Sequence, residues 1–429
     1  MTMSLVFASM AGLLAFGLPI AFSLGLAACV FFLSAPGVSP AFMIQRMVAT
    51  TESFPLLAVP FFIFAGAVMT QGGITERIFG LADALVGHRV GGLAQVNVLN
   101  SVFIGGMSGS GNADAAIDSK TLVPVMVSKG YSKPFSAAVT AASGVIAPII
   151  PPGIGMLIYG FIADVSVGRL FIGGIVPGLL LALGLMIVVH IVSKRRGYGR
   201  QRGRRVPFRE VLGHVRHAAW ALMLPVLILV GLRFGAFTPT EAGAVAAAYA
   251  VFVGMVVYRE IHWRDLGPIV AESLAATAVV MLILATANAL MWALTWERIP
   301  MKMAQALFAL SDNPYVVLLL INILLLFLGC VMEGTALLII LTPIFVPVIV
   351  KLGIDPVHFG LVFVINLTIG AVTPPVGTIL YTVCSIVGVT VEEFTRELWP
   401  FLIALVAVLF LVTYFPPTVL WLPNLVMGK

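Results

Sequence analysis

Polar side chains gather in two short stretches of an otherwise apolar chain. Residues 105–114 have the sequence GGMSGSGNAD, and residues 332–335 have the sequence MEGT. Two further stretches, 147–153 and 371–377, each contain a Pro-Pro pair. Proline removes a backbone donor and clashes with the preceding turn, so each pair is expected to end a helix and leave carbonyl groups without partners. Carbonyl, hydroxyl and amide oxygens are suitable ligands for a hard cation such as Na⁺.

These four interruptions form two pairs, one pair in each half of the chain. We expect the two interruptions of a pair to face each other and to bind a cation, with no transition metal and no other cofactor. The predicted ligands are Ser108, Gly109, Ser110, Asn112, Asp114, Ala147 and Pro148 in the first half and Met332, Glu333, Thr335, Val372 and Thr373 in the second. Ala147, Pro148, Met332 and Val372 would contribute backbone carbonyls. For each serine or threonine, the alternative is a hydrogen bond from its hydroxyl to its own helix.

A helix that starts after an interruption presents free N–H groups and a partial positive charge, and this suits a carboxylate. We therefore expect the tips of two helical hairpins to meet and to hold an anionic substrate between them. The predicted substrate contacts are Ser110, Gly111, Asn112, Pro151, Gly153, Gly334, Thr335, Pro374 and Gly377.

Three charges follow the first polar stretch. Asp114 and Asp118 are four residues apart, so they share one face if the segment is helical. Lys120 follows closely. Charges within a membrane segment are costly and usually functional. Lys120 could neutralise the aspartates, attract an anionic substrate, or extend to a water-filled surface.

The residues Gly106–Gly109 also match G-x-S-G, a pattern found in intramembrane serine proteases. A serine nucleophile needs a base within hydrogen-bond reach. The six histidines all lie near expected loops or span ends, and the second half has Glu333 where the first has Ser108. A hydrolase is therefore a remote alternative.

The composition indicates a polytopic α-helical membrane protein. Apolar residues make up 60% of the 429 residues and charged residues only 10%. A soluble protein could not cover so much apolar surface, and the apolar runs are too long for a β-barrel. Residues 1–25 are expected to form the first membrane span. Nucleic acid is not expected as a partner, because the basic residues are concentrated in one loop between apolar segments.

Basic residues are concentrated in one segment. Residues 194–216 contain nine Lys/Arg and one Glu, or +8, so the remainder of this +6 chain carries about −2. Such a loop between apolar segments marks the cytoplasmic side. Residues 258–265 follow two further spans and return to that side. We expect a first membrane repeat over 1–193, with a hairpin near 93–130, a basic linker over 194–216, and a second repeat over 217–429, with a hairpin near 316–350.

The two halves repeat each other at a nearly constant offset along the chain. Met107–Ser110 corresponds to Met332–Thr335, Pro151-Pro152 to Pro374-Pro375, and Tyr159 to Tyr381. Repeated halves in a membrane protein usually indicate a transporter. The alternatives are duplication for stability alone and a passive channel, neither of which explains why the similarity falls on the interruptions.

Together, these residues resemble a known family, the large membrane (DctM-type) subunit of tripartite ATP-independent periplasmic (TRAP) transporters. The resemblance covers the whole chain. The segments that carry it are Pro60–Gly66, Gly91–Asn97, Gly105–Asp114, Ala137–Ser143, Pro148–Pro152, Phe237–Ala242, Asp355–Gly360 and Thr373–Gly377. The chain departs from the usual family pattern at Ile117-Asp118-Ser119-Lys120.

The resemblance implies an inverted-repeat elevator fold, with a scaffold and a mobile transport domain that carries two re-entrant helical hairpins. It implies Na⁺-coupled uptake of a small carboxylate, such as a C4-dicarboxylate, 2-oxo acid or sugar acid, across the bacterial inner membrane. It also implies two partners, a small four-helix membrane subunit (DctQ-type) and a periplasmic solute-binding protein (DctP-type). A stand-alone Na⁺/carboxylate symporter is the main alternative.

Overall fold

The computed structural model describes residues 2–200, 205–311 and 313–428, and its regular elements there are all helices. Seven of these described helices are long and apolar enough to cross a membrane. They are Phe54–Gln71, Val167–Arg196, Phe208–Arg233, Pro239–Val257, Trp263–Trp296, Gly334–Lys351 and Val391–Tyr414. The predicted all-α polytopic class is therefore confirmed.

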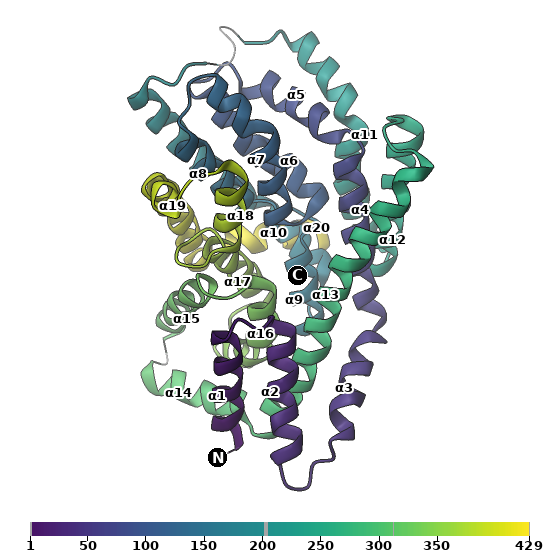
Figure 1. The fold of residues 1–429 in the computed structure, drawn as a ribbon, viewed down its shortest axis with the longest axis vertical. Helices are drawn as coiled ribbons and strands as arrows, with labels where there is room; N and C mark the ends of the chain where they lie inside the picture. Colours follow the sequence, from purple (N-terminus) through teal and green to yellow (C-terminus); the bar gives the residue numbers. More distant parts are fainter. Residues whose placement is uncertain (1, 201–204, 312, 429) are drawn as a thin grey trace.

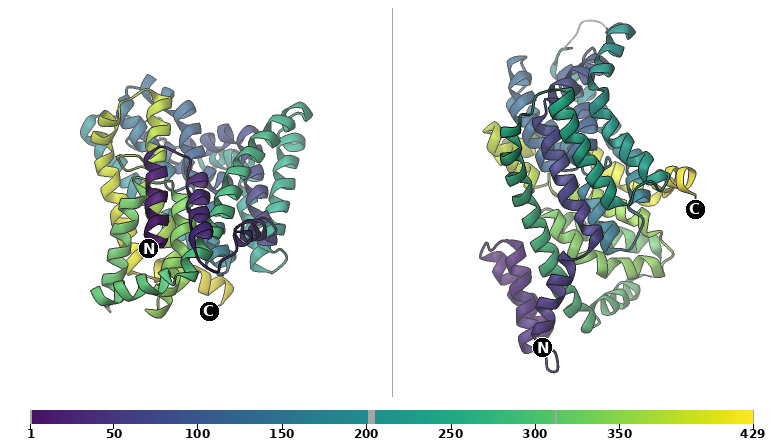
Figure 2. Two further views of the ribbon diagram at one scale, coloured as in Figure 1. Left: turned by 60° about the horizontal axis from the view of Figure 1, so that its bottom comes forward. Right: turned by 90° about the vertical axis from the view of Figure 1, so that its right-hand side faces the viewer.

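The first half begins with three helices that form an arm at one end of the molecule (Figures 1 and 2). They are α1 (Thr2–Ala15), α2 (Ile20–Ser34) and α3 (Ala41–Thr51), and both α2 and α3 pack against the long helix α13 (Trp263–Trp296). The prediction of one span over residues 1–25 is wrong, because the chain turns at Gly17, where φ is +80°, and Pro19 precedes α2. Proline here starts a second helix that folds back on the first.

The rest of the first half contains a hairpin and an interrupted helix pair. The elements are α4 (Ala58–Gln71), α5 (Ile74–Val86), the hairpin arms α6 (Gly92–Ser108) and α7 (Gly111–Ser128), α8 (Lys133–Gly144), α9 (Ile154–Ile162) and α10 (Val167–Arg196). The Pro-Pro pair lies between α8 and α9. Each polar or Pro-Pro stretch therefore separates two helices.

The second half repeats this order. The elements are α11 (Phe208–Arg233), α12 (Pro239–Phe252), α13, α14 (Ile299–Leu310), the hairpin arms α15 (Pro314–Gly329) and α16 (Gly334–Lys351), α17 (Pro356–Gly370), α18 (Thr378–Val387), α19 (Val391–Tyr414) and α20 (Pro417–Met427). The second Pro-Pro pair lies between α17 and α18. Figure 1 shows the first hairpin in the upper part of the molecule and the second in the lower part.

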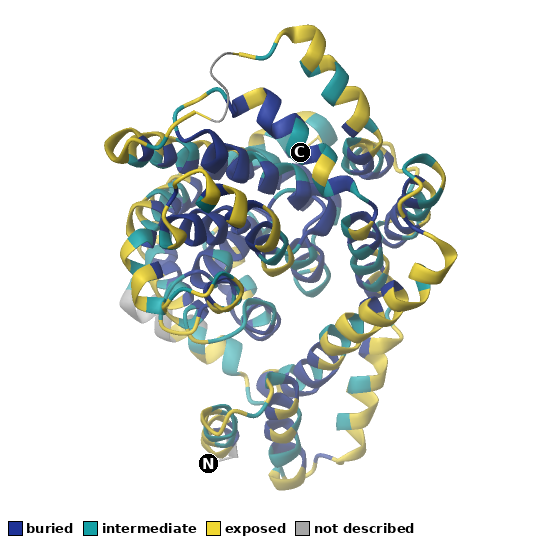
Figure 3. Ribbon diagram, turned by 45° about the horizontal axis from the view of Figure 1, so that its top comes forward, coloured by how far each residue is buried: buried dark blue, intermediate teal, exposed yellow. Residues whose placement is uncertain are grey.

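The hairpins and interrupted helices form the buried body of the molecule (Figure 3). Large apolar side chains are exposed on the arm and on the helices α10 to α13, including Phe16, Leu33, Ile44, Leu183, Phe252 and Val279. An exposed apolar surface of this kind fits lipid rather than water. The buried body is therefore framed by helices suited to contact the membrane.

The basic linker contacts the base of the first hairpin. The helix α10 extends into the predicted linker 194–216 as far as Arg196, and α11 begins within it at Phe208. The Gly199 carbonyl accepts hydrogen bonds from the N–H groups of Gly91 and Gly92 at 3.2 and 3.3 Å. The positive-inside rule predicts that this base lies on the cytoplasmic side.

Basic groups also surround a surface cavity of about 460 Å³ at this base. Its lining includes His88, Arg89, Arg200 and Arg205. Burial lowers the pKa of His88, and the charges of Arg205, Arg89 and Arg200 lower it further. The positive potential that favours the cytoplasmic orientation is thus present in the folded protein.

Close backbone contacts hold each hairpin against the interrupted helix of its own half. A Cβ built on Gly105 would lie 2.6 Å from the Ala147 Cα, and a Cβ built on Gly370 would lie 2.6 Å from the Gly329 carbonyl carbon. Gly105 and Gly329 both lie near the C-terminal ends of the first hairpin arms, α6 and α15. Small residues let backbones approach in this way inside membranes.

We expect Gly370→Ala to destabilise the protein, because the added methyl group would overlap the Gly329 backbone, which cannot move aside as a side chain can. Overpacking of this type costs about 1–3 kcal/mol. Thermal unfolding of the purified protein, followed by intrinsic fluorescence, should show a lower midpoint.

Gly267→Ala is the matched control, since Gly267 lies within α13 and a Cβ built there meets no atom within 4 Å. Alanine favours a helix over glycine, so this variant should unfold at or above the wild-type temperature. Equal midpoints for Gly370→Ala and Gly267→Ala would contradict the close contact.

Candidate functional site

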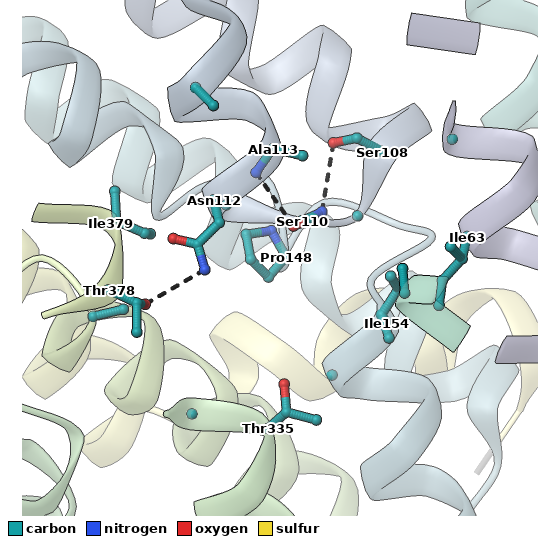
Figure 4. Close-up of a pocket in the computed structure, with 18 of the residues that line it drawn as sticks. Ile63, Ser108, Ser110, Asn112, Ala113, Pro148, Ile154, Thr335, Thr378 and Ile379 are labelled. Carbon is teal, nitrogen blue, oxygen red and sulfur yellow. Dashed lines mark hydrogen bonds between the residues drawn. The ribbon is translucent and has the colours of Figure 1, made fainter. Parts of the chain in front are cut away.

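A cavity of about 550 Å³ lies between the two hairpins. Its walls come from α4, α7, α9, α13, α16, α17 and α18, and from the tip of the first hairpin. Figure 4 shows the tip residues of the first hairpin on one side of this space and Thr335 of the second on the other. Segments from the two halves of the chain therefore share one polar cavity.

Four helices begin at the wall of this cavity. They are α7, α9, α16 and α18, and the cavity is lined by Gly111 and Asn112, Ile154 and Gly155, Gly334 and Thr335, and Thr378 and Ile379 from their first turns. The first turn of a helix has N–H groups without helical partners and a partial positive charge. Four such ends around one space favour an anion within it.

Each of these hairpin arms packs against the helix that follows the interruption of the other half. The hairpin arm α7 packs against α18, which follows the second interruption, and the hairpin arm α16 packs against α9, which follows the first. The Asn112 Nδ2 donates to the Thr378 Oγ1 at 3.4 Å across the first of these contacts. The cavity is thus built jointly by both repeats.

The tip of the first hairpin is a tight turn between α6 and α7. Gly109 has φ of +59°, and a Cβ there would lie 2.3 Å from the Pro152 carbonyl oxygen, so only glycine fits. The Ser110 Oγ accepts a hydrogen bond from the Ala113 N–H at 3.4 Å and caps α7. The Ser108 Oγ accepts from the Ser110 N–H at 3.5 Å. This tip therefore places two hydroxyl groups beside the Pro-Pro interruption of its own half.

The tip of the second hairpin is capped by a carboxylate. The two oxygens of Glu333 accept hydrogen bonds from the N–H groups of Thr335 and Ala336, both at 2.9 Å. A negative charge is favourable at this end of a helix. The Cys330 carbonyl accepts from the Val376 N–H at 2.9 Å, which joins this tip to the second Pro-Pro interruption. Each tip therefore contacts the interruption of its own half, as predicted.

Most carbonyl groups at the interruptions have no protein donor among the described residues, and the predicted cation ligands are among them. In the parts of the chain that the structure describes, no hydrogen bond reaches the carbonyl oxygen of Ala147, Pro148, Met332 or Val372. These are the four carbonyls that the sequence nominated as cation ligands. An unsatisfied carbonyl away from water costs free energy, so a bound cation would stabilise this arrangement.

The predicted site residues fall into two groups. Those that line the cavity are Ser108, Gly109, Ser110, Gly111, Asn112, Pro148, Glu333, Gly334 and Thr335. Those that lie outside its lining are Asp114, Ala147, Pro151, Gly153, Met332, Val372, Thr373, Pro374 and Gly377. The Thr373 Oγ1 donates to the Ile369 carbonyl at 2.7 Å, so it forms the bond to its own helix that was the alternative.

The two aspartates lie inside the first hairpin rather than at the cavity. Asp114 and Asp118 are fully buried, and the Asp118 Oδ1 accepts from the Asn100 Nδ2 at 2.8 Å. Lys120 instead lines the cavity and forms no ion pair with them within the described residues. The expectation that Lys120 could neutralise the aspartates is therefore wrong for this structure.

Several polar residues of the site were not predicted from the sequence. Thr378, Gln71 and Glu272 line the cavity, and the Gln71 Nε2 donates to the Glu272 Oε2 at 3.3 Å. Thr378 could have been found, because it follows Pro-Pro-Val-Gly at the start of the next helix. Gln71 and Glu272 come from α4 and α13, and nothing in their local sequence indicates the contact.

In each half, a buried hydrogen bond from an asparagine side chain was also missed. The Asn97 Nδ2 donates to the Thr140 Oγ1 at 2.7 Å, and the Asn366 Nδ2 donates to the Asn322 Oδ1 at 2.7 Å. Asn97 and Asn322 occupy matching positions in the two repeats, and each joins the first arm of a hairpin to the helix before an interruption. Buried bonds of this kind fix one arrangement of the backbone.

The chain matches the family model described as "Tripartite ATP-independent periplasmic transporter, DctM component" over residues 7–418. It is 41% identical to the sialic acid TRAP transporter large permease protein SiaM of Vibrio cholerae, over 97% of each chain. It is 40% identical to the isethionate TRAP transporter permease protein DctMQ of Oleidesulfovibrio alaskensis, over 93% of this chain and 63% of that one. It is also 40% identical to the C4-dicarboxylate TRAP transporter large permease protein DctM of Pseudomonas aeruginosa, over 94% of each.

Two solved structures share the fold at low sequence identity. The Alcanivorax borkumensis transporter YdaH superimposes with a TM-score of 0.59 at 16% identity, over 90% of each chain. Neisseria gonorrhoeae MtrF superimposes with a TM-score of 0.62 at 13% identity, over 92% of this chain and 95% of that one. At these identities the likeness supports the architecture alone.

We expect Glu333→Ala to loosen the tip of the second hairpin, because the first N–H groups of α16 lose both acceptors. Loss of a helix cap costs about 1 kcal/mol. Glu333→Gln keeps one acceptor oxygen and should lie between this variant and the wild type. Hydrogen–deuterium exchange at the Thr335 and Ala336 amides is the measurement.

Glu392→Ala is the control, since Glu392 is an exposed carboxylate that pairs with Arg396 one turn away on α19. An exposed pair contributes little to stability, so exchange in the second hairpin should be unchanged. Equal exchange at Thr335 in wild type and Glu333→Ala would contradict the capping role.

Proposed function

Because the chain belongs to the DctM family of TRAP transporter large permease subunits, we propose that it takes up a small organic anion coupled to Na⁺. Family membership makes it a multi-pass subunit of a transporter in the bacterial inner membrane, and not an enzyme. The coupling ion, the substrate class and the mechanism of movement belong to the proposal.

Four helices begin at one cavity, and this is the observation that supports an anionic substrate. A carboxylate there would accept hydrogen bonds from N–H groups of α7, α9, α16 and α18 and would lie in their combined positive potential. The named substrates of the relatives, sialic acid, isethionate and C4-dicarboxylates, all carry an acidic group. We therefore propose a small carboxylate or a related organic acid.

The free carbonyl groups support a cation beside this anion. Ala147 and Pro148 in the first half, and Met332 and Val372 in the second, present carbonyl oxygens without donors among the described residues. The hydroxyls of Ser108 and Ser110, and that of Thr335, lie close to these interruptions. Oxygen ligands without a full charge suit a monovalent cation, and a bound cation strengthens the attraction for the anion.

The position of the cavity fits alternating access by an elevator movement. Its lining extends from the hairpin tips to Gln71 and Glu272. Gln71 ends α4, and close after it Arg77 pairs with Glu260 of the 258–265 loop at 3.1 Å. The charges of this loop predict the cytoplasmic side, so we propose that the cavity opens toward the cytoplasm. We propose that the two hairpins with α8, α9, α17 and α18 move as one body past the long helices α4 and α11 to α13.

We also propose two partners, a small four-helix membrane subunit (DctQ-type) and a periplasmic solute-binding protein (DctP-type). Support comes from the relative named DctMQ, of which this chain covers 63%, leaving a segment outside the match. A stand-alone Na⁺/carboxylate symporter would need neither partner. A hydrolase receives no support, since the cavity lining within the described residues contains no histidine to serve as a base.

Reconstituted in liposomes with both partners, the protein should take up organic anion only when Na⁺ is higher outside than inside. The free energy for uptake would come from Na⁺ that binds beside the anion and moves with it down the Na⁺ gradient. Uptake of radiolabelled substrate is the measurement. Equal uptake driven by a proton gradient without Na⁺ would contradict Na⁺ coupling, and uptake by this chain alone would favour the symporter.

Ser110→Ala and Thr335→Ala should each raise the Na⁺ concentration needed for half-maximal uptake, by about tenfold for a lost ligand. Ser128→Ala and Thr121→Ala are the controls. Both lie on α7 outside the cavity lining, and their hydroxyls donate to carbonyls of their own helix at 2.8 and 2.9 Å. Unchanged Na⁺ dependence in both test variants would remove these hydroxyls from the site.

A further inference from the structure

We propose that Lys120 binds a second acidic group of the substrate, so that this transporter prefers anions with two separated acidic groups. This inference rests on the proposed function, because it assigns a residue of the same cavity. A carboxylate, sulfonate or phosphate would each meet the requirement at Lys120. The first acidic group would remain at the four helix starts.

The helical periodicity of α7 places Lys120 on the wall of the cavity. Ala113, Ala116, Ile117 and Lys120 all line the cavity, and their spacing of three, one and three residues defines one face of the helix. Asp114 and Asp118 lie on the other face, buried against α6. One helix thus turns its cation toward the cavity and its acids away from it.

The ammonium group of Lys120 has no ion-pair partner within the described residues. Its nearest acid in the sequence, Asp118, is fully buried and accepts from Asn100 at 2.8 Å. Lys120 itself is exposed to the cavity. It is also the one basic side chain among the described residues of the lining. An unpaired cation in a confined space is suited to an anionic group of a ligand.

Two acids also line the described cavity wall, and both have donors elsewhere. Glu333 accepts from the N–H groups of Thr335 and Ala336, both at 2.9 Å. Glu272 accepts from the Gln71 Nε2 at 3.3 Å. Neither lies within 4.0 Å of a basic group in the described parts of the chain. The positive charge of Lys120 therefore stays available to a substrate.

Distance along α7 separates Lys120 from the anion position at the tip. Nine residues from Gly111 to Lys120 correspond to a rise of about 14 Å. Helical side chains lean toward the N-terminus, so an extended lysine brings its Nζ back by up to about 6 Å. The two positive regions are thus at least about 8 Å apart. One small carboxylate cannot contact both, whereas an anion with acidic groups at both ends can.

The test compares acids of equal chain length that differ by one carboxylate. Calorimetric titration of the full-length protein in lipid nanodiscs, at saturating NaCl, would use adipate against hexanoate and succinate against butyrate as probes. We expect wild type to bind the dicarboxylate of at least one pair about tenfold more tightly, the loss expected for one charge-assisted bond. Lys120→Gln should reduce that dicarboxylate to the affinity of its monocarboxylate, and Lys120→Arg should retain the preference.

Lys129→Gln is the matched control, because Lys129 is an exposed lysine at the end of the same helix and outside the described lining. It should behave as wild type. The proposal is overturned if Lys120→Gln keeps the dicarboxylate preference, or if wild type shows none in either pair. Na⁺-driven uptake by wild type, measured in parallel, distinguishes this outcome from failure of the proposed function itself.

Discussion

Where a helix is interrupted inside a membrane, the backbone N–H and carbonyl groups lose their helical hydrogen bonds and need other partners. The arrangement of this molecule depends on that requirement. The chain interrupts its helices at four places, and all four lie beside one another around a single cavity. Helix starts point their N–H groups at this space, while the carbonyls of Ala147, Pro148, Met332 and Val372 remain without donors in the described regions. If the four interruptions lay far apart in the membrane, each would expose unsatisfied polar atoms to hydrocarbon. Gathering the interruptions around one cavity would let bound ions of both signs satisfy such groups together.

The contacts between each hairpin and its interrupted helix make this gathering possible. Gly105 against Ala147, and Gly329 against Gly370, bring backbones so close that a side chain would not fit. Asn97 with Thr140, and Asn322 with Asn366, then add a buried hydrogen bond to the same pair of elements in each half. The glycine contacts fix the distance between the hairpin arm and the interrupted helix, and the asparagine hydrogen bond fixes how the two are aligned along their length. Both devices recur between the same elements of the two halves, so the halves share a packing arrangement as well as a sequence motif.

The sequence allowed much of this fold to be predicted, for identifiable physical reasons. Proline pairs and glycine-rich tips have strong local preferences, so both hairpins and both interruptions were predicted from the residues alone. The division of α1 from α2 was missed because Pro19 lies within a long apolar run. Gln71 and Glu272 were missed because they meet only through the packing of α4 and α13. Thr373 was wrongly assigned because its hydroxyl bonds to the Ile369 carbonyl of its own helix, and local sequence does not determine this choice.

The position of Lys120 shows what periodicity adds to motif recognition. Residues two apart on a helix do not face each other, so Asp118 and Lys120 could not form a pair on α7 once that segment was helical. The same rule assigns Asp114 and Asp118 to one face, where they lie between the hairpin arms. The two halves differ in a related way. The neutral Ser110 caps α7, whereas the charged Glu333 caps α16 with two shorter hydrogen bonds. The two halves therefore share a backbone arrangement but differ in charge. The first half contributes the positive charge of Lys120 to the cavity wall, and the second contributes the negative charge of Glu333 at its hairpin tip.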